Sequence, residues 1–449
     1  MKKILTLLCL AQFMLIVDVT VVNVAMPTIG ADLGLGRGGL AWVVAAYSLC
    51  FGGLLLLGGR LADALGPRRT FLAGLAVFTT ASLAAGLARD GGLLIGARAT
   101  QGVGAALLSP SALAILTTVF EGPARTRALG VWAALGGTGA ASGVLLGGAL
   151  TSGPGWRWVF AVNVPVGVAL LAAVPRVVPA VAGRRGGGTD LAGALAVTAG
   201  AGLLLYGLIR AGDDGWSDRA ALACLAGAAV AVALFVARER TARTPLVPPR
   251  LLAQPGLAAG AGVMLAASAL LIAAFFLCSL YLQDVRHYSP WRTGLAFLPV
   301  ALATIAGAHT GVRMLGRVGR RPVGMAAFAV AAAGAALLSR LPADGSVPLR
   351  LEPGFVLLAA GLGAGFVCAT TTAMGGPAGQ HHAGLVSGIV NTCHELGSAL
   401  GLAGVAAAGG FRTAFTAGAV LALVVAVASA RLLPAGRPDL DPDRPAFAH

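Results

Sequence analysis

Long apolar stretches that alternate with short polar segments dominate the hydropathy pattern of this chain. A helix that crosses a bilayer needs about 20 mostly apolar residues, because it rises only about 1.5 Å per residue. Fourteen stretches are long enough, and they predict an all-α polytopic membrane protein. They lie at about 4–27, 39–60, 70–88, 92–120, 127–150, 157–175, 190–209, 219–237, 256–282, 291–312, 322–339, 354–375, 383–408 and 412–432.

The composition agrees with a membrane protein, because 57% of the residues are hydrophobic and 11% are charged, whereas soluble domains carry about 25% charged residues. The net charge of +15 comes from arginines in short loops, so it does not indicate a nucleic-acid partner. With a cytoplasmic N-terminus, the predicted inner loops carry about twice as many Lys and Arg residues as the outer loops. This bias predicts a multi-pass plasma-membrane protein with both termini in the cytoplasm.

An internal repeat divides the chain. Residues 39–42 (GLAW) are echoed by residues 294–297 (GLAF), and the polar loop at 59–69 is echoed by residues 315–322. The nearly equal offsets of 255 and 253 residues indicate two similar halves in tandem. The predicted organisation is a six-helix half at 1–180, a two-helix insert with a cytoplasmic linker at 181–250, a second six-helix half at 251–433, and a disordered cytoplasmic tail at 434–449.

The loop between the second and third spans combines a turn, a carboxylate and two cations. The residues concerned are Gly59, Asp63, Gly66, Arg68 and Arg69. This pattern resembles the G-x-L-x-D-x-x-G-x-R-R signature of the major facilitator superfamily. The resemblance implies two parallel six-helix halves and a conformational latch at the cytoplasmic face, where Arg68 and Arg69 can pair across the halves. The second copy lacks the acid, because Gly316 stands at the position of Asp63.

Two ionisable residues lie inside predicted spans, Asp18 in the first and Arg98 in the fourth. An ionisable group in hydrocarbon is costly, so it indicates a functional site by default. At 1.5 Å per residue both lie about 10–14 Å below the outer surface, which allows them to pair. Their surroundings resemble the L-D-x-T-V-V-N-V-A-x-P and R-x-x-Q-G-x-G-A-A motifs of the fourteen-helix drug:proton antiporter family. The resemblance implies a role in proton coupling; a static salt bridge is the alternative.

The predicted fifth span carries glycines at helical spacing, at Gly139, Gly143, Gly147 and Gly148. They resemble the antiporter motif G-x-x-x-G-P-x-x-G-G, which is typical of exporters. Val144 replaces the motif's proline, so the kink that proline brings is not expected. A plain face for close helix packing is the alternative interpretation.

Glu395 lies near the middle of the predicted thirteenth span and departs from the family pattern, whereas Asn391 and Gly397 match it. Three roles are open for Glu395: a second protonation site, a counter-charge for a cationic substrate, or a neutral hydrogen-bonding group. His309 and His394 are single histidines in apolar spans, and such residues more often pack than relay protons.

The resemblance covers nearly the whole chain and implies proton-coupled efflux of amphiphilic drugs, antibiotics or endogenous metabolites by alternating access. The expected partners are a small amphiphilic substrate, protons and the lipid bilayer, and the expected state is a monomer. No metal or cofactor besides the proton gradient is expected, because the six cysteines lack metal-ligand spacing. The candidate pocket side chains are polar or aromatic: Asn23, Trp42, Tyr47, Gln101, Trp132, Phe276, Tyr281 and Asn391.

Three other functions compete with this prediction. A nutrient importer would lack the exporter-type glycines. A membrane-embedded enzyme would need a nucleophile and base or a metal site, and the sequence has no H-E-x-x-H motif, no P-loop and no Cys/His cluster. A non-transporting sensor is compatible with the sequence.

Overall fold

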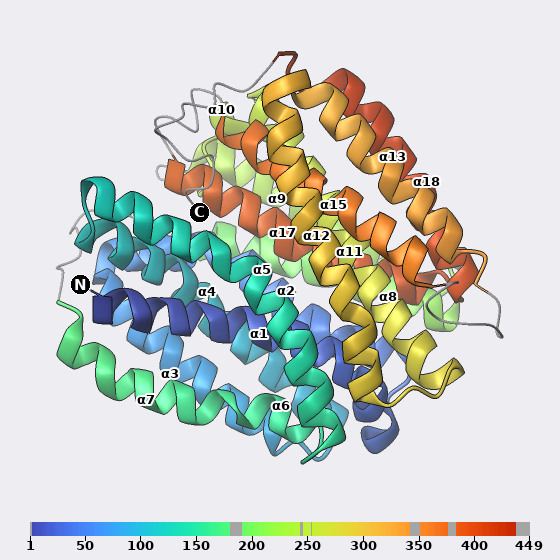
Figure 1. The fold of residues 1–449 in the computed structure, drawn as a ribbon, viewed down its shortest axis with the longest axis horizontal. Coiled ribbons are helices and arrows are strands. Elements are labelled where there is room, and N and C mark those ends of the chain that lie inside the picture. Colours follow the sequence, from blue (N-terminus) through green and yellow to red (C-terminus); the bar gives the residue numbers. More distant parts are fainter. Residues whose placement is uncertain are drawn as a thin grey trace. The chain divides into compact units, whose positions relative to one another are not determined.

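The structure is a computed structural model, and it describes residues 2–179, 191–242, 246–252, 254–341, 351–375 and 383–436. Within these ranges the chain forms helices and turns and has no β-strand (Figure 1). The N-terminal helices are α1 (Lys2–Leu33), α2 (Arg37–Leu65), α3 (Pro67–Gly86), α4 (Gly91–Val119), α5 (Gly122–Ser152), α6 (Arg157–Ala161) and α7 (Asn163–Val177).

Two long helices and one short helix follow: α8 (Leu191–Asp214), α9 (Arg219–Thr241) and α10 (Pro249–Leu252). The C-terminal elements are α11 (Pro255–Leu280), which continues into the π-helical segment η1 (Tyr281–Val285), then α12 (Pro290–Val318), α13 (Arg320–Leu338), α15 (Glu352–Met374), α17 (Ala383–Ala407) and α18 (Phe411–Leu432).

Every predicted span corresponds to a helix, and the sixth span is divided into α6 and α7. By length and hydropathy, 12 of the described helical segments can cross a membrane. Two further helices, α5 with 31 residues and α17 with 25 residues, are also long enough. The all-α polytopic prediction is therefore confirmed, and the count of fourteen is supported approximately.

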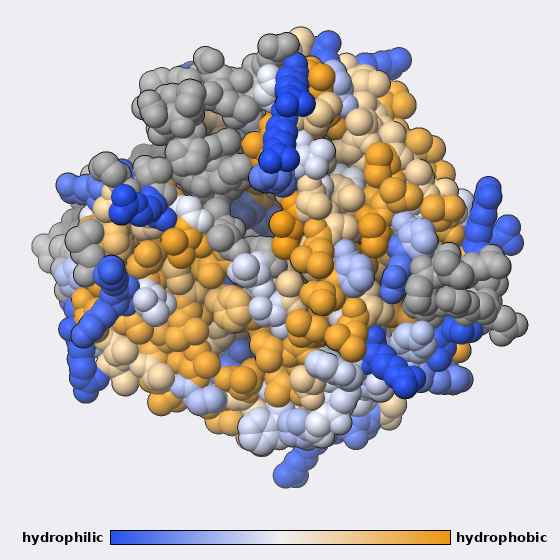
Figure 2. All heavy atoms as spheres, viewed as in Figure 1, coloured by the Kyte–Doolittle hydropathy of each residue, from blue (hydrophilic) through white to orange (hydrophobic). Residues whose placement is uncertain are grey.

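The apolar surface of these helices is exposed in the way a bilayer protein requires. On α9, the side chains of Val230, Val232, Leu234 and Val236 are all exposed. Figure 2 shows hydrophobic side chains over much of the visible face, with strongly hydrophilic side chains mostly toward its margins. Such exposure is unfavourable in water but not in lipid, whose tails are as apolar as these side chains. The chain is a multi-pass membrane protein.

The chain divides into two compact units. The first contains Met1–Leu203 and Gly227–Leu246, and the second contains Leu204–Ala226 and Val247–Leu440. Each of α8 and α9 therefore contributes residues to both units. The boundaries proposed for the two halves and the insert stay predictions.

Glycines allow α4 to pack backbone to backbone on α2 in the first unit. A Cβ atom on Gly58 would lie 1.9 Å from the carbonyl oxygen of Ala106, and one on Gly102 would lie 2.4 Å from that of Tyr47. No other residue fits at these contacts without a shift of the backbone. At the start of α4, the carboxylate of Asp90 accepts a hydrogen bond from the backbone N–H of Leu93 at 2.9 Å, which caps the helix.

The repeat predicted from the sequence has a structural counterpart at two tight helix connections. Gly66 joins α2 to α3 with φ of +94°, and Gly319 joins α12 to α13 with φ of +89°. A positive φ is adopted without strain by glycine. Glycine is therefore required at equivalent positions of the two repeated segments.

Candidate functional site

Asp18 and Arg98 form a buried ion pair in the first unit. Nη1 of Arg98 lies 2.5 Å from Oδ2 of Asp18, and both side chains are 0% exposed. The helices α1 and α4 carry these residues at similar depth, as the sequence predicts, and the structure confirms that the side chains meet. Their role in proton coupling stays a prediction.

Two amide side chains complete the hydrogen bonding of the Asp18 carboxylate. Oδ1 of Asp18 accepts hydrogen bonds from Nδ2 of Asn163 at 2.8 Å and from Nε2 of Gln101 at 3.1 Å. Gln101 also accepts a hydrogen bond from Nη1 of Arg98 at 2.9 Å and donates to Oγ of Ser82 at 2.8 Å. Donors from α4 and α7 thus surround one carboxylate, and each interacts favourably with its negative charge.

The α2 helix fixes the guanidinium of Arg98 from the other side. Nε of Arg98 donates to the carbonyl oxygen of Val43 at 3.0 Å. The guanidinium carbon lies 4.3 Å from the ring centroid of Tyr47 and 5.8 Å from that of Phe160, within the range of cation–π attraction. Nη2 is buried and has no hydrogen-bond partner among the described residues. The close approach of α4 to the backbone of Tyr47 at Gly102 makes this arrangement possible.

Asn163 and Ser82 were not among the predicted site residues. Both are small polar residues in otherwise apolar stretches. Their side chains bind Asp18 and Gln101 respectively. An amide or hydroxyl in a membrane span was the available signal, but it did not distinguish these residues from other isolated polar residues in the spans.

The predicted glycines of α5 pack against α1 on both sides of Asp18. A Cβ atom on Gly139 would lie 2.8 Å from Cγ2 of Ile16, and one on Gly143 would lie 1.8 Å from Oγ1 of Thr20. Gly148 is also buried. The α5 helix is unbroken along its length, as expected when Val144 replaces proline. The structure shows the packing face, and the link of these glycines to export stays a prediction.

The substitution Gly147→Val tests this packing. A Cβ atom at Gly147 would lie 2.9 Å from the carbonyl oxygen of Val21, so the larger side chain must separate α1 from α5. We expect a loss of about 1–3 kcal/mol, as for overpacked cores, seen as a lower melting temperature in detergent. Leu146→Ala is the control, because the side chain of Leu146 is exposed. Equal melting temperatures for Gly147→Val and the control would contradict the close α1–α5 contact.

Most of the predicted latch loop is helical: Gly59 and Asp63 lie in the last turns of α2, Gly66 joins α2 to α3, and Arg68 and Arg69 lie in the first turn of α3. Asp63 and Arg69 are exposed, and Gly66 adopts the positive φ described above. Nη2 of Arg68 donates to the carbonyl oxygen of Pro175 on α7 at 2.8 Å. The described contact of Arg68 therefore lies within the first unit, whereas the sequence analysis expected a contact across the two halves. Asp63 has no ion-pair partner among the described residues.

Most of the candidate pocket residues of the first unit are buried. Tyr47 and Gln101 belong to the ion-pair network, where both are fully buried. Trp132 packs in a hydrophobic cluster with residues of α1, α3, α4 and α7. Asn23 is buried and donates to the carbonyl oxygen of Val19 on its own helix at 3.0 Å, and Trp42 is partly buried. In this structure the fully buried residues offer no surface to a ligand.

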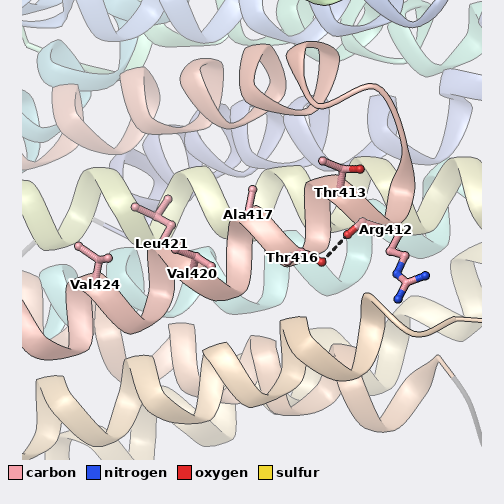
Figure 3. A pocket seen from close by; sticks show the side chains of 7 residues that line it. All are labelled: Arg412, Thr413, Thr416, Ala417, Val420, Leu421 and Val424. Carbon is pink, nitrogen blue, oxygen red and sulfur yellow. Dashed lines mark hydrogen bonds between the residues drawn. The ribbon is translucent and has the colours of Figure 1, made fainter.

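In the second unit, Phe276 is 1% exposed and Tyr281 is buried with its ring centroid 6.1 Å from that of Phe411. Asn391 is exposed. A groove of about 700 Å³ runs along one face of α18 (Figure 3). Its lining residues are Arg412, Thr413, Thr416, Ala417, Val420, Leu421 and Val424. None of the predicted pocket residues lines this groove, and a membrane helix presents such a face to lipid.

The model of the Major Facilitator Superfamily matches residues 8–402. The chain belongs to the major facilitator superfamily. The cephamycin export protein of Amycolatopsis lactamdurans is 42% identical over 405 residues, covering 89% of this chain and 83% of the relative. The puromycin resistance protein of Streptomyces alboniger is 40% identical over 407 residues, covering 89% and 80%. The methylenomycin A resistance protein of Bacillus subtilis (strain 168) is 33% identical over 404 residues, covering 89% and 86%.

Membership of the major facilitator superfamily indicates a transporter rather than an enzyme. The described residues contain no group of three or more His, Cys, Asp or Glu side chains that could hold a metal ion.

The second unit of this major facilitator protein contains a partly buried polar pair that the sequence did not reveal. Oγ of Ser268 on α11 lies 2.7 Å from Nδ1 of His394 on α17, and the ring centroid of Phe366 lies 5.5 Å from that of His394. His394, for which the sequence favours packing over a proton relay, thus has a hydrogen-bond partner. Glu395 follows it and is partly buried. The three roles of Glu395 stay predictions.

Proposed function

We propose that this major facilitator protein exports a small amphiphilic compound, such as an antibiotic or an endogenous metabolite, in exchange for protons. The observation that carries the proposal is the ion pair of Asp18 and Arg98, fully buried within membrane helices. Ionisable groups are retained at such positions chiefly for function, because their burial is costly. Export as the direction of transport is supported by the relatives, which are named for cephamycin export and for resistance to puromycin and methylenomycin A.

Asp18 is the proposed proton-binding group. In the ionised state its charge is balanced by Arg98 and by the amide donors of Gln101 and Asn163. When a proton neutralises Asp18, Arg98 keeps its charge in a site where a lone charge is unfavourable. The two protonation states therefore favour different arrangements of the helices around Asp18, and alternating access needs two such arrangements.

Other parts of the chain have proposed roles in the same cycle. The loop with Gly59, Asp63, Gly66, Arg68 and Arg69 acts as a conformational latch at the cytoplasmic face. Glu395 acts as a second protonation site or as the counter-charge for a cationic substrate. Both termini lie in the cytoplasm, the protein works as a monomer, and the proton gradient supplies the energy without a further cofactor.

Transport by the purified protein in proteoliposomes tests the proposal. The panel includes a cephamycin, puromycin and methylenomycin A, and the imposed pH gradient has an acidic lumen. We expect accumulation of at least one compound in the lumen, independent of ATP and abolished by a proton ionophore. Protein-free liposomes control for passive trapping of weak bases. Protein-dependent transport that persists at full rate after the gradient has collapsed would contradict proton exchange.

A further inference from the structure

The α1 helix is clasped to the α6–α7 segment at two levels. At the inner level, the carboxylate of Asp18 accepts a hydrogen bond from Asn163 at 2.8 Å. At the outer level, the carboxylate of Asp32 accepts hydrogen bonds from Nη1 of Arg157 at 2.8 Å and from Nε1 of Trp156 at 3.0 Å. We call these the inner clasp and the outer clasp. The two acids are 14 positions apart on α1, which is about 21 Å along a helix.

A break of one residue lies between the two clasps, at Val162, whose dihedral angles (φ −61°, ψ −26°) stay helical. Val162 separates α6 from α7, and Asn163 is the first residue of α7. The outer clasp holds α6, and Nη2 of Arg157 also donates to the carbonyl oxygen of Ala88 at 3.2 Å. The inner clasp holds the start of α7. If the inner clasp opens while the outer clasp stays closed, the break at Val162 is where the backbone can bend.

We propose that Asn163 is a positioning residue that transmits the protonation of Asp18 to the joint between α6 and α7. This inference rests on the proposed function. Because Asn163 does not bind the proton itself, it acts through its hydrogen bond to Asp18.

The hydrogen-bond pattern makes Asn163 the responsive donor. Arg98 and Gln101, both on α4, bind each other and have further partners in Val43 and Ser82. The amide of Asn163 donates to Asp18 alone among the described residues. Hydrogen bonds to a charged acceptor are about twice as strong as neutral ones. Neutralising Asp18 therefore weakens the bond that holds α7, while the donors on α4 keep other partners.

Asp18 is the acid to whose protonation the inner clasp responds, and the groups that face it from the neighbouring helices support this assignment. Arg98 faces it from α4, and Tyr47 on α2 lies beneath that guanidinium. The α5 helix presents Gly139 and Gly143 to the neighbouring turns of α1. Phe160 on α6 approaches Arg98 and has no titratable group. The next acid on α1 is Asp32, in the half-exposed outer clasp.

The substitution Asn163→Leu tests the inference, because leucine has a similar size and no donor. Losing a hydrogen bond to the carboxylate makes its neutral form easier to reach. The pH of half-maximal gradient-driven transport should therefore rise by about one to two units. Accumulation driven by the gradient should fall about ten-fold more than substrate exchange at equal pH on both sides. Thr79→Val is the matched control, because Thr79 packs against Gly167 of α7 and binds Leu75 on its own helix.

Hydrogen exchange of residues 157–177, corrected for the intrinsic effect of pH, gives a readout that needs no substrate. In the wild-type protein and in Thr79→Val, exchange should increase as Asp18 becomes protonated. In Asn163→Leu it should be high at every pH. An unchanged pH midpoint with equal losses of accumulation and exchange would overturn the inference, as would wild-type pH dependence of hydrogen exchange in Asn163→Leu. If the wild-type protein itself shows no proton-driven transport, the proposed function fails, and the hydrogen-exchange comparison still decides the role of Asn163.

Discussion

Replacing Asp18 with asparagine is expected to abolish gradient-driven efflux while the protein stays folded and inserted. Asparagine has nearly the same size, and its single carbonyl oxygen can still accept a hydrogen bond from Arg98, although its NH2 group then replaces the oxygen that accepts from Gln101 and Asn163. It cannot bind a proton in the relevant pH range. We expect gradient-driven accumulation in proteoliposomes to fall at least about 100-fold, with substrate binding changed only a few-fold.

A carboxylate-to-amide change elsewhere provides the control for Asp18→Asn. Glu121 is exposed before α5, and its side chain makes no capping hydrogen bond, so Glu121→Gln should transport like the wild-type protein. Size-exclusion profiles and melting temperatures in detergent establish that both variants are folded. An Asp18→Asn protein with undiminished, gradient-dependent accumulation would show that Asp18 is not the proton-binding group.

Removing Arg98 is expected to destabilise the protein more than removing any exposed arginine. Arg98→Met leaves the Asp18 carboxylate buried without a cation, and breaking a buried pair in this way costs about 3–5 kcal/mol. The double variant Asp18→Leu/Arg98→Met should recover most of this loss, since apolar side chains of similar volume often replace a buried pair without penalty. Melting temperatures of the wild-type protein, Asp18→Leu, Arg98→Met and the double variant form a double-mutant cycle.

The double variant also separates stability from function. It lacks both ionisable groups, so it should fold about as well as the wild-type protein and show no gradient-driven transport. Arg127→Met is the control for loss of an arginine, because Arg127 is exposed near the start of α5. If the double variant is as unstable as Arg98→Met, the loss of stability does not come from leaving the Asp18 carboxylate without a cation. If the double variant still transports with the gradient, the pair does not couple protons.

The described helices follow from the sequence, although several extend five or six residues beyond the predicted spans, as α1 does to Leu33 and α12 does to Val318. In a bilayer every backbone N–H and C=O must form a hydrogen bond within the segment. An apolar stretch long enough to cross the bilayer is therefore expected to form a helix. Gly66 and Gly319 mark two turns, because the backbone at each turn has a positive φ, which glycine adopts without strain. Chain direction and rise per residue also predict depth. For that reason the pairing of Asp18 with Arg98 could be predicted from the sequence.

The sequence also indicated the superfamily, because its motifs are short, local and tied to particular spans. The glycines of α5 were recognised as a packing or exporter-type face for the same reason. Position along a helix can be counted from the sequence.

Tertiary structure decided which side chains share a site. Whether Asn163 reaches Asp18 depends on the break at Val162 and on how far α7 is rotated about its axis. The hydropathy of an apolar span contains no information about that rotation. The contact of Arg68 with Pro175 and the pairing of Ser268 with His394 likewise depend on neighbours far away in the chain.

The candidate pocket residues show the same limit. Aromatic and amide side chains such as Trp132, Phe276 and Gln101 suit a binding surface by chemical type, yet the structure buries them in packed interiors. Depth and chemical type are properties of one segment and can be obtained from the sequence. Facing direction is a property of several packed helices, because it is set by how their side chains and glycines fit together.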